Sequence, residues 1–116
     1  MKLEDCLVRP SLAVLGGKWK AVIIYHLLDG PRRYGELRKL IPDSTQKMMT
    51  QQLRELEADG LVSRHVYHQV PPKVDYDLTE LGMTLRPVME VLCRWGKSYT
   101  SAKSRALRKQ QRNLLQ

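Results

Sequence analysis

The stretch that decides the fold is PDSTQKMMTQQLRELEADGLVSRHVYHQVPPKVDYDLT, which spans Pro42–Thr79. Its first half has the apolar spacing of an amphipathic helix, and its second half alternates with the period of two that is typical of strands. Thr45 is a candidate N-cap and Gly60 a candidate left-handed stop, so we expect a helix over Thr45–Ala58. A two-stranded hairpin that turns at Pro71-Pro72 should follow this helix directly.

The predicted helix has two different faces. Its apolar stripe, which can face a core, consists of Met49, Leu53 and Leu56. Its polar side carries Lys47, Gln51 and Arg54, with Thr50 beside them. Such side chains donate hydrogen bonds to phosphates and base edges. A polar-faced helix followed by a basic hairpin is the layout of a winged helix-turn-helix, and it indicates DNA binding.

The flanking segments are predicted to be helical. Upstream we expect helices over Pro10–Leu15, Lys18–Leu28 and Tyr34–Leu40. The buried stripe expected for the second of these is Trp19, Val22, Ile23 and Leu27. Downstream, Thr79 is the candidate N-cap of a long amphipathic helix. Pro87 lies inside that pattern and should bend or break the helix.

The expected fold is mainly α with a small β-hairpin, a winged helix-turn-helix with N- and C-terminal dimerisation helices. We predict one domain over residues 1–116, with a DNA-binding core at about 18–78 and dimerisation elements at about 6–15 and 79–110. The apolar residues of the long C-terminal pattern are Val88, Met89, Val91, Leu92, Trp95 and Tyr99. They can pack within one chain or against a second copy. We favour a homodimer, because helix-turn-helix proteins usually bind two-fold symmetric sites.

Charge points to a polyanionic partner. The net charge is +8 and the pI about 9.8, and small basic domains usually bind nucleic acid or an anionic membrane surface. Double-stranded DNA is the better match, because no basic helix carries an aromatic-rich membrane face. No apolar run approaches the roughly 20 residues of a membrane span, and the N-terminus lacks the apolar region of a signal peptide. We therefore expect a cytoplasmic protein.

Few residues suggest metal or catalytic chemistry. The two cysteines, Cys6 and Cys93, are far apart in the sequence and are expected to be reduced thiols. His65 and His68 are better interpreted as polar hairpin residues than as metal ligands, and His26 as a packed or semi-buried histidine. We see no nucleophile–base pair, paired carboxylates, phosphate-binding glycine loop or metal set. The sequence predicts no enzyme, no metal and no cofactor.

At this level of detail the sequence resembles the HxlR-type winged-helix transcriptional regulators, relatives of the MarR group, over nearly its whole length. The matching blocks are LGGKW (Leu15–Trp19), DGPRRYGEL (Asp29–Leu37), KMMTQQLRELEADGLV (Lys47–Val62) and VPPKVDY (Val70–Tyr76), followed by Leu78-Thr79 and Gly82. The resemblance implies a homodimeric bacterial DNA-binding regulator, often of a nearby gene for a detoxifying oxidoreductase. Several members look like sensors of oxidants or electrophiles through an N-terminal cysteine, and Cys6 occupies that position. The chain departs from the family at Leu7, where proline is common, and at Tyr34 and Ser44.

The predicted function is therefore a sequence-specific transcriptional regulator, most simply a homodimeric repressor on a pseudo-palindromic operator. Lys47 and Gln51 are predicted to reach base edges, and Arg54 a base or a phosphate. Thr45 and Thr50 should hold phosphates. The wing residues predicted to contact the backbone or minor groove are Arg64, His65, His68 and Lys73. Weaker phosphate candidates are Lys18 and Arg32 or Arg33.

Sensing through Cys6 is a hypothesis that the residues alone do not decide. Lys2 and Arg9 favour a thiolate at Cys6, whereas Glu4 and Asp5 oppose it. Modification of Cys6, or its linkage to the other subunit, would shift the dimer and misalign the recognition helices. Cys93 is expected to be buried and inert.

Two other interpretations stay open at this point. One is a regulator that responds to a small aromatic or aldehyde effector without thiol switching. Its pocket would be lined by Trp19, Tyr25, Met89 and Trp95, although all four are more often plain core residues. The other is a winged-helix protein–protein adaptor that does not bind DNA, which the basic charge and the Lys47/Gln51/Arg54 face oppose.

Overall fold

The computed structural model describes residue 2 and residues 6–114, so Glu4 and Asp5 lie outside the described part. The chain divides into two compact units, one ending at Arg86 and the other beginning at Pro87. The elements are α1 (Val8–Leu15), α2 (Lys20–Leu27), β1 (Arg32–Arg33), α3 (Tyr34–Leu40), α4 (Gln46–Ala58), β2 (Val62–Tyr67), β3 (Lys73–Leu78), α5 (Glu80–Met83) and α6 (Arg86–Leu114). The predicted order of helices and hairpin is confirmed.

The predicted limits of α4 are confirmed by local geometry. The Thr45 side-chain oxygen accepts a hydrogen bond from the Met48 N–H at 3.1 Å, which satisfies one of the free amides of the first turn. After the helix, Gly60 has a φ of 77°, which a residue without a Cβ adopts at no steric cost. A polar N-cap and a glycine stop thus fix the length of the helix on which the site is built.

The core of the first unit lies where α2, α3 and α4 meet β2 and β3. Its fully buried side chains are Ile23, Ile24, Leu27, Leu37, Met49, Leu53, Leu56 and Val62. The predicted stripe of α2 was partly wrong, because Val22 is 37% exposed whereas Ile24 is completely buried. α2 contacts α1, α3, α4 and β3, so it buries more of its circumference than a single stripe.

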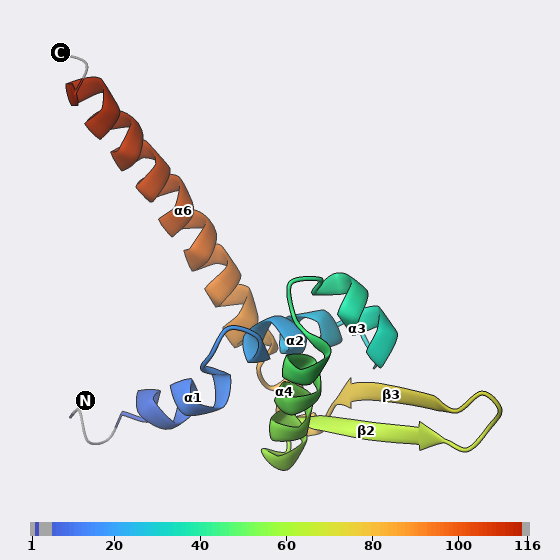
Figure 1. Cartoon of the computed structure of the whole chain (residues 1–116). Helices are drawn as coiled ribbons and strands as arrows, with labels where there is room; N and C mark the ends of the chain where they lie inside the picture. Colours follow the sequence, from blue (N-terminus) through green and yellow to red (C-terminus); the bar gives the residue numbers. More distant parts are fainter. Residues whose placement is uncertain (1, 3–5, 115–116) are drawn as a thin grey trace. The chain divides into compact units, whose positions relative to one another are not determined.

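The sheet has three antiparallel strands in the order β1-β3-β2. β2 and β3 form the predicted wing, with Val62 opposite Leu78 and Tyr67 opposite Lys73. They extend side by side to a loop at their far end (Figure 1). β1 was not predicted, since a two-residue strand is too short to show a period.

The junction after the wing is closely packed. The Thr79 hydroxyl donates to the Gly60 carbonyl at 2.6 Å and accepts from the Gly82 N–H at 3.0 Å, so it joins the end of α4 to the start of α5. A Cβ at Gly82 would collide with the Leu61 carbonyl oxygen. The predicted break in the long helix falls at Thr84-Leu85, and Pro87 is the second residue of α6, where proline is tolerated.

The second unit is the rest of α6, which continues as helix to Leu114. Its Trp95 and Tyr99 rings stack with centroids 5.2 Å apart. Cys93 is exposed, so its predicted burial was wrong. The spacing of apolar residues in α6 suggests that this helix packs in a core, but most of its side chains are exposed to solvent. In the described part of the chain, none of the helices combines the length and apolar character needed to cross a membrane.

Candidate nucleic-acid interface

The exposed face of α4 gathers the predicted base-reading residues. Lys47, Gln51 and Arg54 are exposed and Thr50 is half-buried. All four line one open depression along the helix. The opposite face buries Met49, Leu53 and Leu56, as predicted. Since the buried face fixes how the helix is rotated, the polar face is held outward.

Tyr34 secures α4 to the preceding helix, a role that the sequence analysis did not assign. The Tyr34 hydroxyl donates to the Gln46 carbonyl at 3.2 Å and lies 3.4 Å from the Thr50 hydroxyl oxygen. Thr45, as N-cap, uses its side-chain oxygen as a hydrogen-bond acceptor within the protein. Both threonines predicted to hold phosphates are therefore also structural. Thr45 retains a hydroxyl hydrogen that can be donated, whereas the Thr50 hydroxyl donates to the Tyr34 oxygen, whose own hydrogen is used for Gln46.

Three of the four predicted contact residues of the wing are in open positions. Arg64, His65 and His68 are exposed, His68 lying in the loop between the strands. Arg64 borders a second depression together with Thr50 and Arg54 of α4. The structure therefore brings the base of the wing next to the polar face of the helix. The tip of the wing is further along the hairpin.

Lys73, the fourth wing residue, has partners of its own. Its ammonium lies 3.5 Å from a carboxylate oxygen of Asp75 and 4.8 Å from the centroid of the Tyr67 ring. Asp75 is buried, and among the described residues its second carboxylate oxygen has no hydrogen-bond partner. A buried carboxylate is costly unless it is paired, so Lys73 helps to stabilise the wing whether or not it also contacts DNA.

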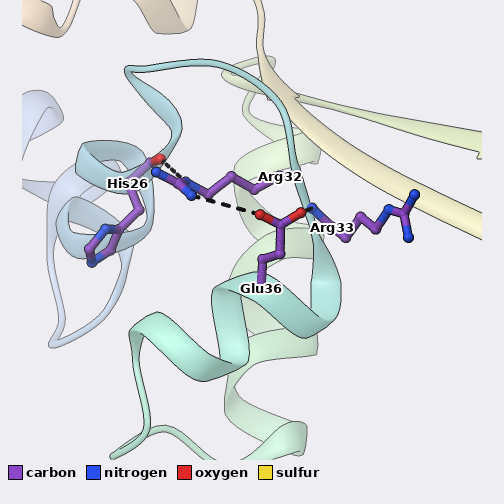
Figure 2. Close-up of polar contacts among 4 residues, drawn as sticks. All are labelled: His26, Arg32, Arg33 and Glu36. Atoms are coloured by element: carbon purple, nitrogen blue, oxygen red, sulfur yellow. Dashed lines mark hydrogen bonds and ion pairs between the residues drawn. The ribbon is translucent and has the colours of Figure 1, made fainter.

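The adjacent arginines Arg32 and Arg33 differ in availability (Figure 2). Arg32 Nε donates to the His26 carbonyl at 2.6 Å, and its guanidinium lies 3.8 Å from Glu36. The Arg33 backbone N–H donates to Glu36 at 3.2 Å, while its side chain points away from the other three residues. Of the two candidates, Arg33 is free to reach a phosphate and Arg32 is structural. Lys18, the remaining weak candidate, lies over the Trp19 ring.

The polar face of α4 is also connected to α2 through Glu55, which the sequence analysis did not single out. Lys20 Nζ lies 2.8 Å from one Glu55 oxygen, and Gln51 Nε2 donates to the other at 3.4 Å. The hydrogen bond from Lys20, with a further one from Gln51, holds the pKa of Glu55 below its usual value. Glu55 is therefore ionised at neutral pH. The Gln51–Glu55 spacing could be seen in the sequence, but Lys20 comes from a distant helix.

Other titratable groups lie outside the polar face of α4 and the wing. Among the described residues no group of three or more histidine, cysteine or acidic side chains is placed to hold a metal ion. Cys6 is half-buried and, like Cys93, a free thiol. Burial, and secondarily the charge of Arg32, lowers the pKa of His26, which agrees with its predicted semi-buried position.

Comparison with known proteins places this architecture in a family. Residues 14–104 match the family model of the HxlR-like helix-turn-helix. The HTH-type transcriptional regulator YybR of Bacillus subtilis strain 168 is 56% identical over 95 residues, which cover 82% of this chain and 76% of YybR.

Solved structures agree. The reduced form of the redox regulator HypR is 52% identical with a TM-score of 0.81, covering 85% of this chain and 98% of the HypR chain. HypR is also known in its oxidised form. The reduced form of the transcriptional regulator YodB from B. subtilis is 35% identical with a TM-score of 0.72, covering 85% and 94% of the two chains. The relatives are regulators of transcription and not enzymes. The chain belongs to the HxlR family of winged helix-turn-helix transcriptional regulators.

Proposed function

We propose that the protein is a homodimeric repressor that binds a pseudo-palindromic operator in double-stranded DNA. In this proposal α4 enters the major groove, whose width of about 12 Å admits a helix. Lys47, Gln51 and Arg54 reach the bases or nearby phosphates. The observation that carries the proposal is their common position on one face of a helix whose other face is anchored in the core.

The wing supplies the second set of contacts. Arg64, His65, His68 and Lys73 follow the backbone or the adjacent minor groove, and Thr45, Thr50 and Arg33 hold phosphates. These contacts carry no sequence information by themselves, but they set the orientation of α4 on the duplex. The net charge of +8 favours association with any DNA. A repressor of this kind acts in the cytoplasm, at the nucleoid.

Dimerisation is assigned to α1 and α6. α1 exposes Val8 and Leu12, and α6 exposes an apolar series. The exposed members of that series are Val88, Val91, Leu92, Trp95 and Tyr99, whereas Met89 is buried in the single chain. Apolar side chains of this number are usually covered in soluble proteins, and a second copy covers them with two-fold symmetry. Two copies would then present two α4 helices to two half-sites.

The test is a binding titration of the purified protein on its own upstream intergenic DNA and on a random duplex, at several salt concentrations. Tight binding to the first duplex only is expected, with transcription of the adjacent gene rising when the regulator is deleted. Equal, weak and steeply salt-dependent binding to both duplexes would contradict sequence-specific regulation. Absence of binding to either would favour the protein–protein adaptor. A fall in transcription on deletion would contradict repression alone.

We propose further that oxidants or electrophiles control this regulator through Cys6. The support is that Cys6 is a half-buried free thiol two residues before α1, and that the similar protein HypR is a redox regulator with oxidised and reduced forms. Modification at the start of α1 would disturb one of the two assigned dimer elements and misalign the recognition helices.

The variant Cys6→Ser tests this second proposal, and Cys93→Ser is the matched control for a thiol in α6. Oxidant should release the wild type and Cys93→Ser from the operator but leave Cys6→Ser bound. Release of Cys6→Ser by oxidant would contradict sensing at Cys6. If oxidant releases none of the three, an effector other than an oxidant becomes the better explanation.

A further inference from the structure

We infer that Glu55, held by Lys20, is a positioning residue that fixes which end of the Gln51 side-chain amide faces the DNA. The inference deepens the proposed function and rests on it, because it assumes that Gln51 reads a base. It adds a specificity determinant that is itself not required to touch a base. It also assigns a role in DNA reading to a residue of α2.

The geometry forms a short relay across two helices. Gln51 and Glu55 are four residues apart on α4, so their side chains are neighbours on one face. Glu55 uses one oxygen for Gln51 Nε2 and the other for Lys20 Nζ, at 3.4 and 2.8 Å. The Lys20 side chain is only 12% exposed, whereas that of Glu55 is 43% exposed. The relay therefore runs from a well-packed anchor to a side chain on the open polar face.

The polarity of the amide follows from the chemistry of its partner. An ionised carboxylate accepts hydrogen bonds and has none to donate, so the NH₂ end of Gln51 must face Glu55. One of the two Nε2 hydrogens is used in this contact. The carbonyl oxygen of Gln51 is left free as an acceptor, beside the remaining Nε2 hydrogen.

This orientation predicts which bases Gln51 selects. In the major groove, adenine presents an amino donor beside its N7 acceptor, and cytosine presents an amino donor. Guanine presents two acceptors and thymine one, and neither offers a donor there to a free carbonyl oxygen. A held Gln51 should therefore prefer adenine or cytosine at its position, because their amino groups lie in the major groove. An unrestrained Gln51 can turn its NH₂ end toward guanine or thymine instead.

Lys20 has a second effect on the same face. A free carboxylate on a helix that approaches DNA repels the phosphates. Lys20 compensates the charge of Glu55 at 2.8 Å, so the positioning residue is compatible with binding. Glu55 therefore supplies a hydrogen-bond acceptor for Gln51, while Lys20 neutralises its charge.

The test compares Glu55→Gln with Glu57→Gln on a set of operators in which each base is varied. Both substitutions remove one negative charge from α4, and within the described residues Glu57 is exposed and has no ion pair. Glu55→Gln can present either a carbonyl or an amide to Gln51, so the orientation is no longer fixed. We expect the preference for adenine or cytosine at one position to fall about five-fold in Glu55→Gln, since about 1 kcal/mol of discrimination is lost. Glu57→Gln should keep the wild-type preference.

Two further measurements complement this test. The first changes Lys20 in place of Glu55, and the second is made on the protein without DNA. Lys20→Met should lose part of the same preference, while Lys20→Arg should retain it. In the free protein, the Gln51 side-chain amide resonances should move in Glu55→Gln and stay in place in Glu57→Gln.

An unchanged base preference in Glu55→Gln, or unmoved Gln51 resonances, would overturn this inference but leave the proposed function intact. Equal changes in Glu55→Gln and Glu57→Gln would also overturn it, because they would reflect charge alone. A wild-type protein without any base preference would instead overturn the proposed function, and this inference with it.

Discussion

The polar face of α4 and the wing both face outward, but they are held in different ways. α4 buries three side chains in the core and is secured by contacts from Tyr34, Thr45 and Lys20. The wing is exposed from Arg64 to Pro72, and its two strands are held mainly by each other. Base reading requires side chains in fixed positions, whereas contact with the backbone tolerates less exact placement. The difference in anchoring therefore matches a division between reading and holding.

The largest effect is expected from breaking the anchor of α4. Leu53→Ala removes a side chain that is 1% exposed and leaves a cavity behind the helix. We expect the free energy of unfolding, measured with urea, to fall by about 2–5 kcal/mol. The control Met48→Ala, on the exposed side of the same helix, should cost much less. Equal losses in the two variants would mean that α4 is not held by its buried face.

The next largest effect tests whether α4 contacts the bases. Gln51→Ala should relax sequence choice, with a loss of about 1–3 kcal/mol of discrimination between operator and mismatched DNA. Affinity for random duplex should change little. A competition titration on both duplexes checks this. Similar losses on specific and random DNA would show that Gln51 makes no base contact.

A wing substitution should behave differently. Lys73→Ala is expected to weaken binding to all DNA alike and to reduce the salt slope by about one. It should also lower the free energy of unfolding, because buried Asp75 loses its ion-pair partner. Arg64→Ala, which has no such partner among the described ion pairs, should reproduce the binding effect without the loss of stability. Loss of base discrimination in either variant would contradict the division between helix and wing.

The smallest effect is the pH dependence of the free energy of unfolding that comes from His26 in α2. Burial first, and the charge of Arg32 second, lower the pKa of His26 in the folded chain. The unfolded chain therefore binds the proton more readily. The contribution of His26 to the free energy of unfolding is fully present above the unfolded-state pKa of 6.5. It is lost as the pH falls from there through the folded-state pKa. His26→Gln should flatten this part of the stability curve. An unchanged slope would exclude His26 as its cause.

The sequence predicted α4 and its two faces because the signals are local. Thr45, the apolar stripe through Leu53 and the stop at Gly60 lie within one segment, and a segment of that length shows its period clearly. The hairpin was equally visible from its alternation and its proline turn. The face of α4 followed directly, because helical spacing alone decides which side chains lie together.

The features that could not be predicted from the sequence depend on contacts between distant segments. Arg32 and Arg33 are chemically equivalent neighbours, and only the positions of the His26 carbonyl and Glu36 distinguish them. Lys20 meets Glu55 because α2 packs against α4. The exposure of Val22 depends in the same way on which elements surround α2, and β1 exists only because β3 lies beside it.

Gly82 has a consequence for genetic screens of this regulator. Any side chain there would press on the Leu61 carbonyl at the joint where the end of α4, the start of β2 and the start of α5 meet. Loss-of-function alleles should therefore collect at codon 82 as well as at the codons for the residues of α4 that we propose contact DNA. Alleles that abolish regulation while lowering protein abundance would identify this joint, whereas alleles of the polar face of α4 should leave abundance unchanged.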